Sequence, residues 1–143
     1  MYKLIISLLF FSIIFMYSSP SFAQDSKDIN VVLIQTFKLK DRMGDDAAAF
    51  REMLKRQGDI LNKDPRVIRS YTLRHFWGAD SRDLVYVIEF KNYEDLFSFS
   101  DEVNSILEKA LPKEQVDADY ALWGKYVGQH ADEIYQIIPD TKK

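Results

Sequence analysis

The chain has 143 residues, with 19 lysines and arginines against 22 aspartates and glutamates, and a formal net charge of −3. It contains no cysteine, which excludes thiol catalysis, zinc–thiolate sites, iron–sulfur clusters and disulfides. A mildly acidic chain is a poor match for nucleic acid, because phosphate contact depends on clustered lysine and arginine. We therefore expect neither a nucleic-acid partner nor a thiol-based reaction.

The first 23 residues have the pattern of a secretory signal peptide. Lys3 supplies a positive charge, an apolar run extends from Leu4 to Tyr17, and a small-x-small pattern ends at Ala23. A membrane anchor is the alternative, but the run is short of the about 20 residues that a bilayer requires. We expect cleavage after Ala23, no lipoprotein anchor because cysteine is absent, and a periplasmic or secreted single domain of residues 24–143 with no membrane contact.

Hydrophobic periodicity and capping residues predict the secondary structure in chain order. Asp45 or Asp46 is the expected cap of the first helix, and the residue before Pro65 ends it. Asn92, with Asp95 three positions later, is the expected start of the second helix. The predicted elements are a strand at 29–39, a helix at 46–62, a hairpin of strands 67–77 and 83–90 around a turn at 78–82, a helix from 92 to 110, a third helix at 113–128 and a short strand at 134–138.

The order β-α-β-β-α-(α)-β predicts an α+β, ferredoxin-like fold, in which a four-stranded antiparallel sheet carries its helices on one face. The strand at 83–90 has large apolar side chains on both faces, among them Tyr86 and Ile88 on one and Val85 and Val87 on the other. A sheet that is apolar on both faces needs cover on both. We expect the sheet of a second subunit to cover the free face, which gives a symmetric homodimer.

The segment VYVIEFKNYEDLFSF at 85–99 is an apolar strand that ends in an aromatic residue, followed by a polar capping step and an acidic helix start. With the element order, it resembles the dimeric α/β-barrel superfamily, which includes antibiotic-biosynthesis-type monooxygenases and stress-responsive barrel proteins. The resemblance covers about residues 30–139. It implies two sheets packed face to face and a small apolar pocket between sheet and helices. Phe90 stands where haem-degrading members have a tryptophan, so we expect no haem and no other cofactor.

His75 is the first candidate for catalysis. On a strand it shares a face with Tyr71 and Trp77, because alternate residues project together. An imidazole beside phenols can act as a general base near neutral pH, which makes Tyr71 and Tyr86 candidate acid–base partners. The alternative is a structural histidine, bonded to the backbone or to Arg69.

His130 is the second histidine, and the predicted elements place it after the third helix, where the helix dipole favours its charged form. Its acidic neighbours Asp132 and Glu133 match no metal-binding spacing, so we expect no metal site. One of Arg69 and Arg74 is expected to pair with Glu89, and the other is a candidate for an anionic ligand. The candidate ligand-binding residues are Arg69, Arg74, Trp77, Phe90, Trp123 and His130, although Trp123 is also a natural core or interface residue.

Two functions remain open. One is a small, cofactor-independent monooxygenase or isomerase that acts on an apolar or aromatic molecule. The other is a non-catalytic exported dimer that binds a small apolar ligand or a protein. A fold can be argued from sequence pattern, but a function depends on the geometry of a site.

Overall fold

The computed structural model describes residues 29–40, 44–78, 80–139 and 141. Its elements are β1 (Val31–Leu39), a 3-10 turn η1 (Gly44–Asp46), α1 (Ala47–Leu61), β2 (Val67–Arg74), β3 (Asp83–Phe90), α2 (Tyr93–Ala110), α3 (Lys113–Tyr126) and β4 (Val127–Gln136). The signal-peptide prediction falls on residues 1–23, outside the described part, and stays a prediction. In the described part, no helix has the length and apolarity needed to cross a bilayer.

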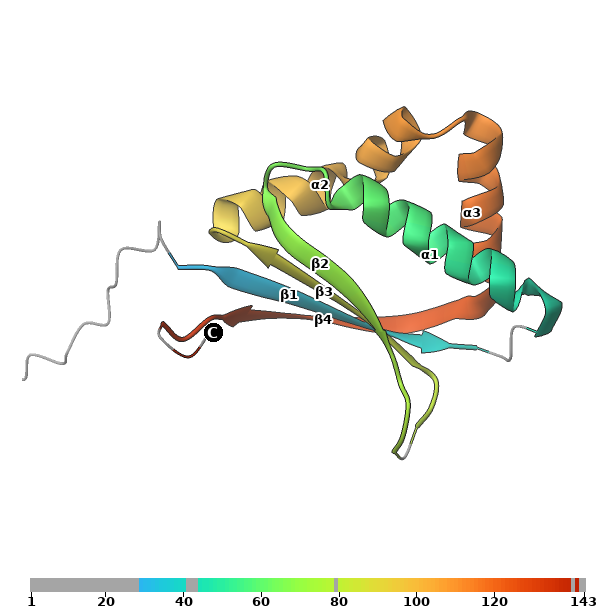
Figure 1. Ribbon diagram of the computed structural model, residues 1–143, viewed down its shortest axis with the longest axis horizontal. Helices are drawn as coiled ribbons and strands as arrows, with labels where there is room; N and C mark the ends of the chain where they lie inside the picture. The colour runs from blue at the N-terminus through green and yellow to red at the C-terminus, as the bar shows by residue number, and fades with distance from the viewer. Residues whose placement is uncertain (1–28, 41–43, 79, 140, 142–143) are drawn as a thin grey trace, which may run out of the picture.

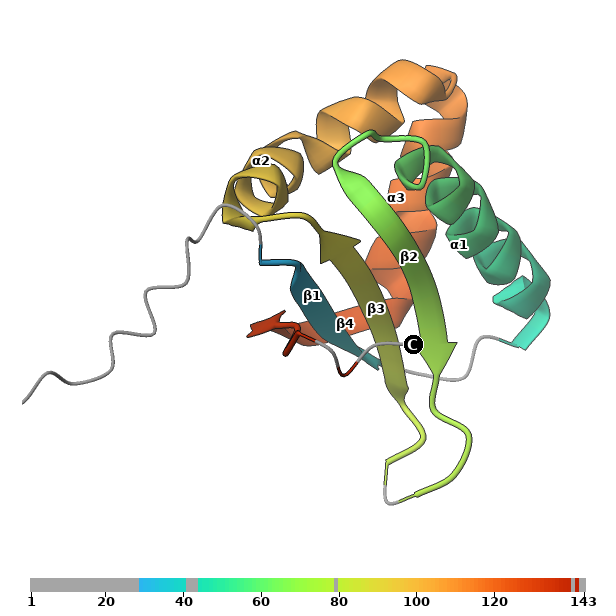
Figure 2. The ribbon, with the colours of Figure 1, turned by 60° about the vertical axis from the view of Figure 1, so that its left-hand side comes forward.

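The four strands form one antiparallel sheet in the order β2-β3-β1-β4, and the helices lie together on one of its faces (Figures 1 and 2). The predicted ferredoxin-like α+β fold is therefore confirmed. β1 and β3 are the central strands, and their alternating pattern is clear because one face of each packs on the helices. The β2–β3 hairpin bends away from the helices and projects below the sheet (Figure 1).

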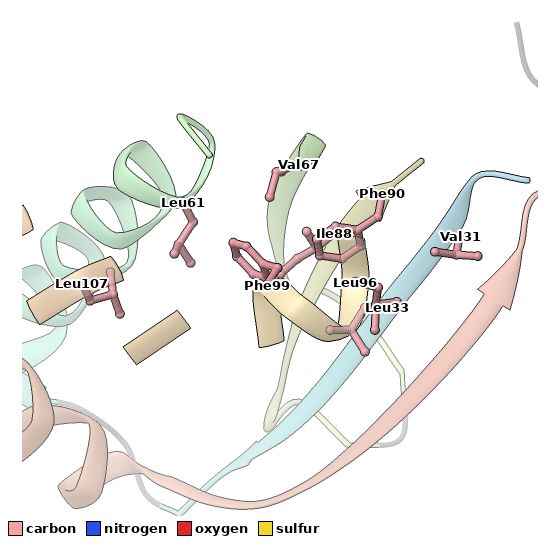
Figure 3. Close-up of a cluster of buried hydrophobic side chains, with 9 residues drawn as sticks. All are labelled: Val31, Leu33, Leu61, Val67, Ile88, Phe90, Leu96, Phe99 and Leu107. Atoms are coloured by element: carbon pink, nitrogen blue, oxygen red, sulfur yellow. The ribbon is translucent and has the colours of Figure 1, made fainter. Parts of the chain in front are cut away.

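Two hydrophobic clusters fill the space between sheet and helices. The larger one joins the sheet to α2 and the end of α1, and it includes Phe90 and Phe99, whose ring centroids lie 5.3 Å apart (Figure 3). The second surrounds Phe50 and Met53 of α1, next to the start of β4. Large apolar side chains with almost no exposure, such as Phe50 and Phe90, are what hold a chain without disulfides together.

The helix caps agree with the sequence at one helix and differ at another. The Asn92 side chain accepts a hydrogen bond from the backbone N–H of Asp95 at 2.8 Å, as expected for the start of α2. Asp46 precedes α1 but makes no side-chain cap. Its carboxylate instead accepts hydrogen bonds from Lys125 Nζ at 2.6 Å and the Tyr126 hydroxyl at 2.5 Å. Asp46, one of the two acids expected to cap α1, therefore links the end of α3 to the start of α1.

Two predicted boundaries are wrong. β2 ends at Arg74 rather than at Trp77, so His75 and Trp77 lie in the hairpin loop. β4 begins at Val127, directly after α3, rather than at Ile134. β4 is an edge strand and is exposed along nearly all of its length. Its sequence therefore lacks the alternation of apolar and polar residues that predicts a strand. His130 therefore lies in the sheet rather than at the end of a helix.

Candidate functional site

A cavity of about 400 Å³ lies between the helix-facing side of the sheet and the three helices. This is a normal size for a small-molecule site. Its walls combine apolar and aromatic side chains with a few polar ones: Leu33, Gln35, Phe37, Gln57, Leu61, Tyr86, Ile88, Phe99, Ser100, Val103, Asn104, Leu107, Tyr120, Trp123 and His130. The described side chains leave this space open, so the cavity can take a ligand.

The register of the strands orders the floor of the cavity into rows. Gln35 of β1 lies opposite Tyr86 of β3 on one side and Asp132 of β4 on the other. Directly opposite residues share a face of the sheet and lie within contact distance. The next row along the strands contains Phe37 and His130. A polar row therefore crosses the sheet beside an aromatic one.

Phe37 is the centre of an aromatic cluster in this floor. Its ring centroid lies 5.4 Å from that of Tyr86, 5.0 Å from that of Trp123 and 5.2 Å from that of His130. The first two contacts are edge-on, and the His130 ring is stacked on Phe37. Such a cluster offers both ring faces and ring edges to a planar aromatic ligand.

A polar chain runs along the β4 side of the cavity. Gln35 Nε2 donates to Asp132 Oδ1 at 3.2 Å, and Asp132 Oδ2 lies 3.6 Å from His130 Nε2. The carboxylate is thus held by the amide and faces the imidazole at ion-pair distance. A positioned carboxylate stabilises the positive form of a histidine when that histidine takes up a proton. The arrangement suits His130 to act as a base.

Tyr86 supplies a phenol on the other side of Gln35. Burial raises the pKa of Tyr86 well above its usual range. Its hydroxyl makes no hydrogen bond to any residue in the described ranges. A phenol that stays protonated at every physiological pH can donate to a ligand oxygen but cannot act as a base.

The helices contribute two amides to the opposite wall. Gln57 of α1 and Asn104 of α2 line the cavity, and neither side chain has a hydrogen-bond partner in the described part of the chain. Behind this wall, Arg56 Nη2 lies 2.5 Å from Asp119 Oδ1 and joins α1 to α3. This ion pair fixes the helix that carries Tyr120 and Trp123. Burial, followed by the Glu108 carboxylate, raises the pKa of Tyr120.

Of the residues expected to be catalytic, only Tyr86 lines this cavity. Tyr71 lies on the opposite face of the sheet, because it pairs with Val87 rather than with a helix-facing residue. The His75 ring packs against Gly78 in the hairpin loop, where a Cβ would lie 2.9 Å from His75 Nε2. His75 and Tyr71 are therefore excluded from the cavity by their position.

The expected ligand-binding residues divide in the same way. Trp123 and His130 line the cavity. Phe90 is sealed in the core with no exposure, so it cannot touch a ligand. Arg69 is the arginine that pairs with Glu89, with Nε 2.7 Å from Oε2, on the face that the helices leave open. Arg74 and Trp77 lie at the solvent-exposed end of the hairpin.

Sequence reasoning missed the polar partners in the cavity. Gln35 and Asp132 are 97 positions apart and meet only through the register of β1 and β4. Gln57 lies four residues after Met53 and four before Leu61, both buried, and this helical spacing was the one available signal that it points inward. Among the described residues, no group of three or more histidines, aspartates and glutamates is placed to hold a metal ion.

The fold is shared with several solved structures. A dimeric protein of unknown function and ferredoxin-like fold from Bacteroides fragilis is 15% identical, covers 76% of this chain and 96% of its own, and has a TM-score of 0.53. SnoaB, a cofactor-independent oxygenase from Streptomyces nogalater, is 10% identical over 80% of this chain and 99% of its own, with a TM-score of 0.51. An uncharacterized NIPSNAP-like domain protein from Burkholderia xenovorans is 14% identical over 80% and 90%, with a TM-score of 0.55.

The chain has a ferredoxin-like fold. This is the fold that the resemblance to the dimeric α/β-barrel superfamily implied. No protein-family model matches the chain, and no curated protein matches it in sequence. At sequence identities of 10–15%, structural similarity shows that the fold is shared and nothing about function.

Proposed function

We propose that this protein is an exported homodimer that binds a small aromatic molecule in the cavity and removes a proton from it without a cofactor. The observation that carries the proposal is that His130 and Tyr86 line one aromatic cavity, with Asp132 beside His130. A base, a carboxylate that supports it and a protonated phenol are the groups that proton abstraction beside a carbonyl or phenol requires.

The roles follow from the geometry. A planar ligand packs against Phe37 and Trp123, with its acidic C–H or O–H directed at His130. His130 takes the proton, and Asp132 stabilises the imidazolium that results. Tyr86 donates a hydrogen bond to the negative oxygen that develops on the ligand, a role for which its raised pKa suits it. Gln57 and Asn104 offer further hydrogen bonds to polar edges of the ligand.

When the proton comes from a C–H bond, the carbanion that is formed has two fates. Return of the proton at another position is isomerisation. Reaction with dioxygen at an activated CH₂ group gives C=O and water, and the substrate supplies all four electrons, so that no cofactor is needed. One of the structures with this fold is described as a cofactor-independent oxygenase, which supports the second fate.

The homodimer is supported by the face of the sheet that the helices leave open. Val32, Ile34, Val85 and Val87 form its centre, and the exposed side chain of Tyr71 borders them. An apolar face of this kind is costly to leave in water. One protein with this fold is described as dimeric. Export rests on the signal-peptide pattern at 1–23 alone.

The test of catalysis uses anthrone, which has an activated CH₂ group between aromatic rings, and follows its oxygen-dependent conversion to anthraquinone by absorbance. We expect the wild-type protein to accelerate the reaction and His130→Gln to lose about 10²- to 10⁴-fold of the rate. His75→Ala is the matched control and should keep the wild-type rate, because His75 lies outside the cavity. Equal acceleration by wild type and His130→Gln would show that His130 is not the base.

A non-catalytic ligand-binding dimer is the second candidate. It is favoured by the side chain of His130, which is 52% exposed, and by its 3.6 Å separation from Asp132, which is longer than a hydrogen bond. An open cavity favours a small ligand over a purely protein-binding role. Binding of a small aromatic molecule without any acceleration of anthrone oxidation would select this candidate.

A further inference from the structure

Phe76 and Trp77, at the tip of the β2–β3 hairpin, are the most exposed large apolar side chains in the described part of the chain. Their side chains are 100% and 89% exposed. The hairpin carries them away from the helices and below the sheet in both views (Figures 1 and 2). Two adjacent aromatic side chains exposed to water in this way indicate an interaction surface.

The exposed apolar residues of the edge strands and the hairpin lie in two groups. One group follows β2 toward the hairpin tip: Ile68, Tyr71, Leu73, Phe76 and Trp77. The other is at the C-terminal end of β4 and consists of Tyr135, which shares the open face with its pair Val32, and Ile138 beyond the strand. Ile134 is also exposed, but it pairs with Leu33 and lies on the helix-facing side. β2 and β4 are the two edges of the sheet, and the hairpin tip and the end of β4 lie at opposite ends of the strands. The two groups therefore occupy diagonally opposite corners.

We propose that the hairpin tip is a dimer clamp, in which Phe76 and Trp77 pack against the C-terminal end of β4 in a second copy of this chain. A two-fold axis along the other diagonal of the sheet brings each of these corners over the opposite corner of the second copy. The two open faces then pack together with their strands nearly perpendicular. Orthogonal packing is one of the two usual arrangements of stacked sheets. Each tip then covers the partner's Tyr135 and the partner's Ile138. Because of the two-fold symmetry, this contact forms two times in the dimer. The clamp rests on the homodimer proposed above.

The area of the interface supports this occupant. From the spacing and rise of its strands, the open face of the sheet measures roughly 500 Å². A stable interface takes about 800 Å² from each partner. Two exposed aromatic side chains add about 150–250 Å² each. Together with the sheet face, they bring the area contributed by each partner to that of a stable interface. The sheet face needs the two tips to make a stable dimer.

The charges at the base of the hairpin favour a protein surface over a membrane. Lys38 is paired with Asp80 at 3.3 Å and with Asp83, and Arg82 Nη2 lies 2.8 Å from Asp80 Oδ2. Paired cations are poor anchors for anionic lipid, which attracts free basic clusters. In the described part of the hairpin, Arg74 is then a single exposed cation beside the two aromatics rather than a basic cluster. The aromatics are therefore the main binding feature of the tip, as expected for the apolar part of an interface with a polar rim.

The test exploits the absence of cysteine in the chain. Protein isolated from cells that express the full-length sequence is prepared with Trp77→Cys and Tyr135→Cys together, oxidised, and run on a non-reducing gel. We expect a covalent dimer from the double variant and none from Tyr135→Cys alone or from Phe97→Cys with Tyr135→Cys. Phe97 is a matched control, because it is a 55% exposed aromatic on α2, on the helix side of the sheet.

Sedimentation of the cysteine-free protein completes the test. We expect wild type to be dimeric, Phe76→Ser with Trp77→Ser to weaken the dimer at least about 100-fold, and Phe97→Ser to leave it intact. A dimer that the double cysteine variant fails to cross-link overturns the clamp but leaves the homodimer standing. A monomeric wild type overturns both, and a monomer that binds anionic vesicles through Phe76 and Trp77 assigns the tip to a membrane instead.

Discussion

Tyr86 shows how one position in a sheet acquires a chemical role. It alternates with Leu84 and Ile88 and so faces the helices, where burial keeps its hydroxyl protonated. The sequence indicated Tyr86 as a candidate because its parity follows the apolar side of β3. The same reasoning could not separate Tyr86 from Tyr71, because alternation assigns two faces to a sheet without saying which one holds a cavity.

Replacing Tyr86 by phenylalanine tests this role. If the phenol donates to a developing oxyanion, Tyr86→Phe should lower kcat for anthrone oxidation by about 10²- to 10³-fold. The apolar ring remains, so ligand affinity and thermal stability should stay near wild type. Steady-state kinetics, with a titration of ligand, separates the two effects, and a rise in KM with unchanged kcat would make Tyr86 a binding residue only.

The sequence singled out His130 as a candidate residue but placed it in the wrong element. Its expected site was a helix end, where the dipole explained it, whereas in the structure it pairs with Phe37 across β4 and β1. Its partners Asp132 and Gln35 depend on a strand register that spans most of the chain. A contact of this kind cannot be deduced from spacing, because each residue is unremarkable in its own segment.

At the scale of elements, the predictions succeeded where one face of an element is buried. Buried and more exposed residues alternate along β1 and β3 because the helices cover one face of the sheet. The Asn92 cap predicts the start of α2. β4 is exposed on both faces and reads as polar turn residues, so its start at Val127 was missed. The end of β2 was missed for the opposite reason, since Phe76 and Trp77 look like strand residues but extend past the sheet.

The junction of α3 and β4 can be tested with its two glycines. A Cβ on Gly128 would lie 3.0 Å from the carbonyl oxygen of Lys38, beside the irregularity in the β1–β4 register. Gly128→Ala should therefore destabilise the protein by about 1–3 kcal/mol. Gly124→Ala meets nothing within 4 Å and lies in α3, so it should stabilise by up to about 1 kcal/mol.

Denaturant melts of the two variants give both free energies of unfolding. Stabilisation by both substitutions would show that helix α3 continues through this junction, because alanine is favoured over glycine inside a helix. A Gly128→Ala variant as stable as wild type would show that the approach of β4 to Lys38 is not tight.

The loop between α1 and β2 should respond to acid. Hydrogen bonds from Arg66 lower the pKa of Asp64, and the two side chains lie 2.8 Å apart between Arg66 Nη2 and Asp64 Oδ2. A depressed carboxyl pKa contributes stability that is present above the ordinary value of about 4 and is lost as the pH falls through the folded-state value. The free energy of unfolding should therefore fall on acidification below about pH 4.

Asp64→Asn should reduce this pH dependence, because the variant has no carboxylate to protonate there. Asp101→Asn, which removes an exposed carboxylate on α2, should leave more of the dependence in place. Melts at neutral and acidic pH would contradict this explanation if the Asp64→Asn slope matched that of wild type.

The whole molecule is built from one sheet with two uses. Its helix-facing side is polar and aromatic around a cavity, and its open side is apolar with exposed aromatics at two corners. In the proposed account, the cavity is the ligand site and the open side is the dimer interface. Because the two uses lie on opposite faces, Tyr71 variants should disturb assembly without reaching the ligand, and Tyr86 variants the reverse.

The central claim is that the cavity binds a small aromatic molecule, and calorimetric titration with 1-naphthol tests it most directly. We expect saturable binding at one site per chain in wild type and in Tyr71→Phe, which alters only the open face. Ser100→Phe places a ring in the cavity from α2 and should abolish binding while the melting temperature shows an intact fold. Absence of saturable binding in wild type, or unchanged binding in a folded Ser100→Phe variant, would contradict the account.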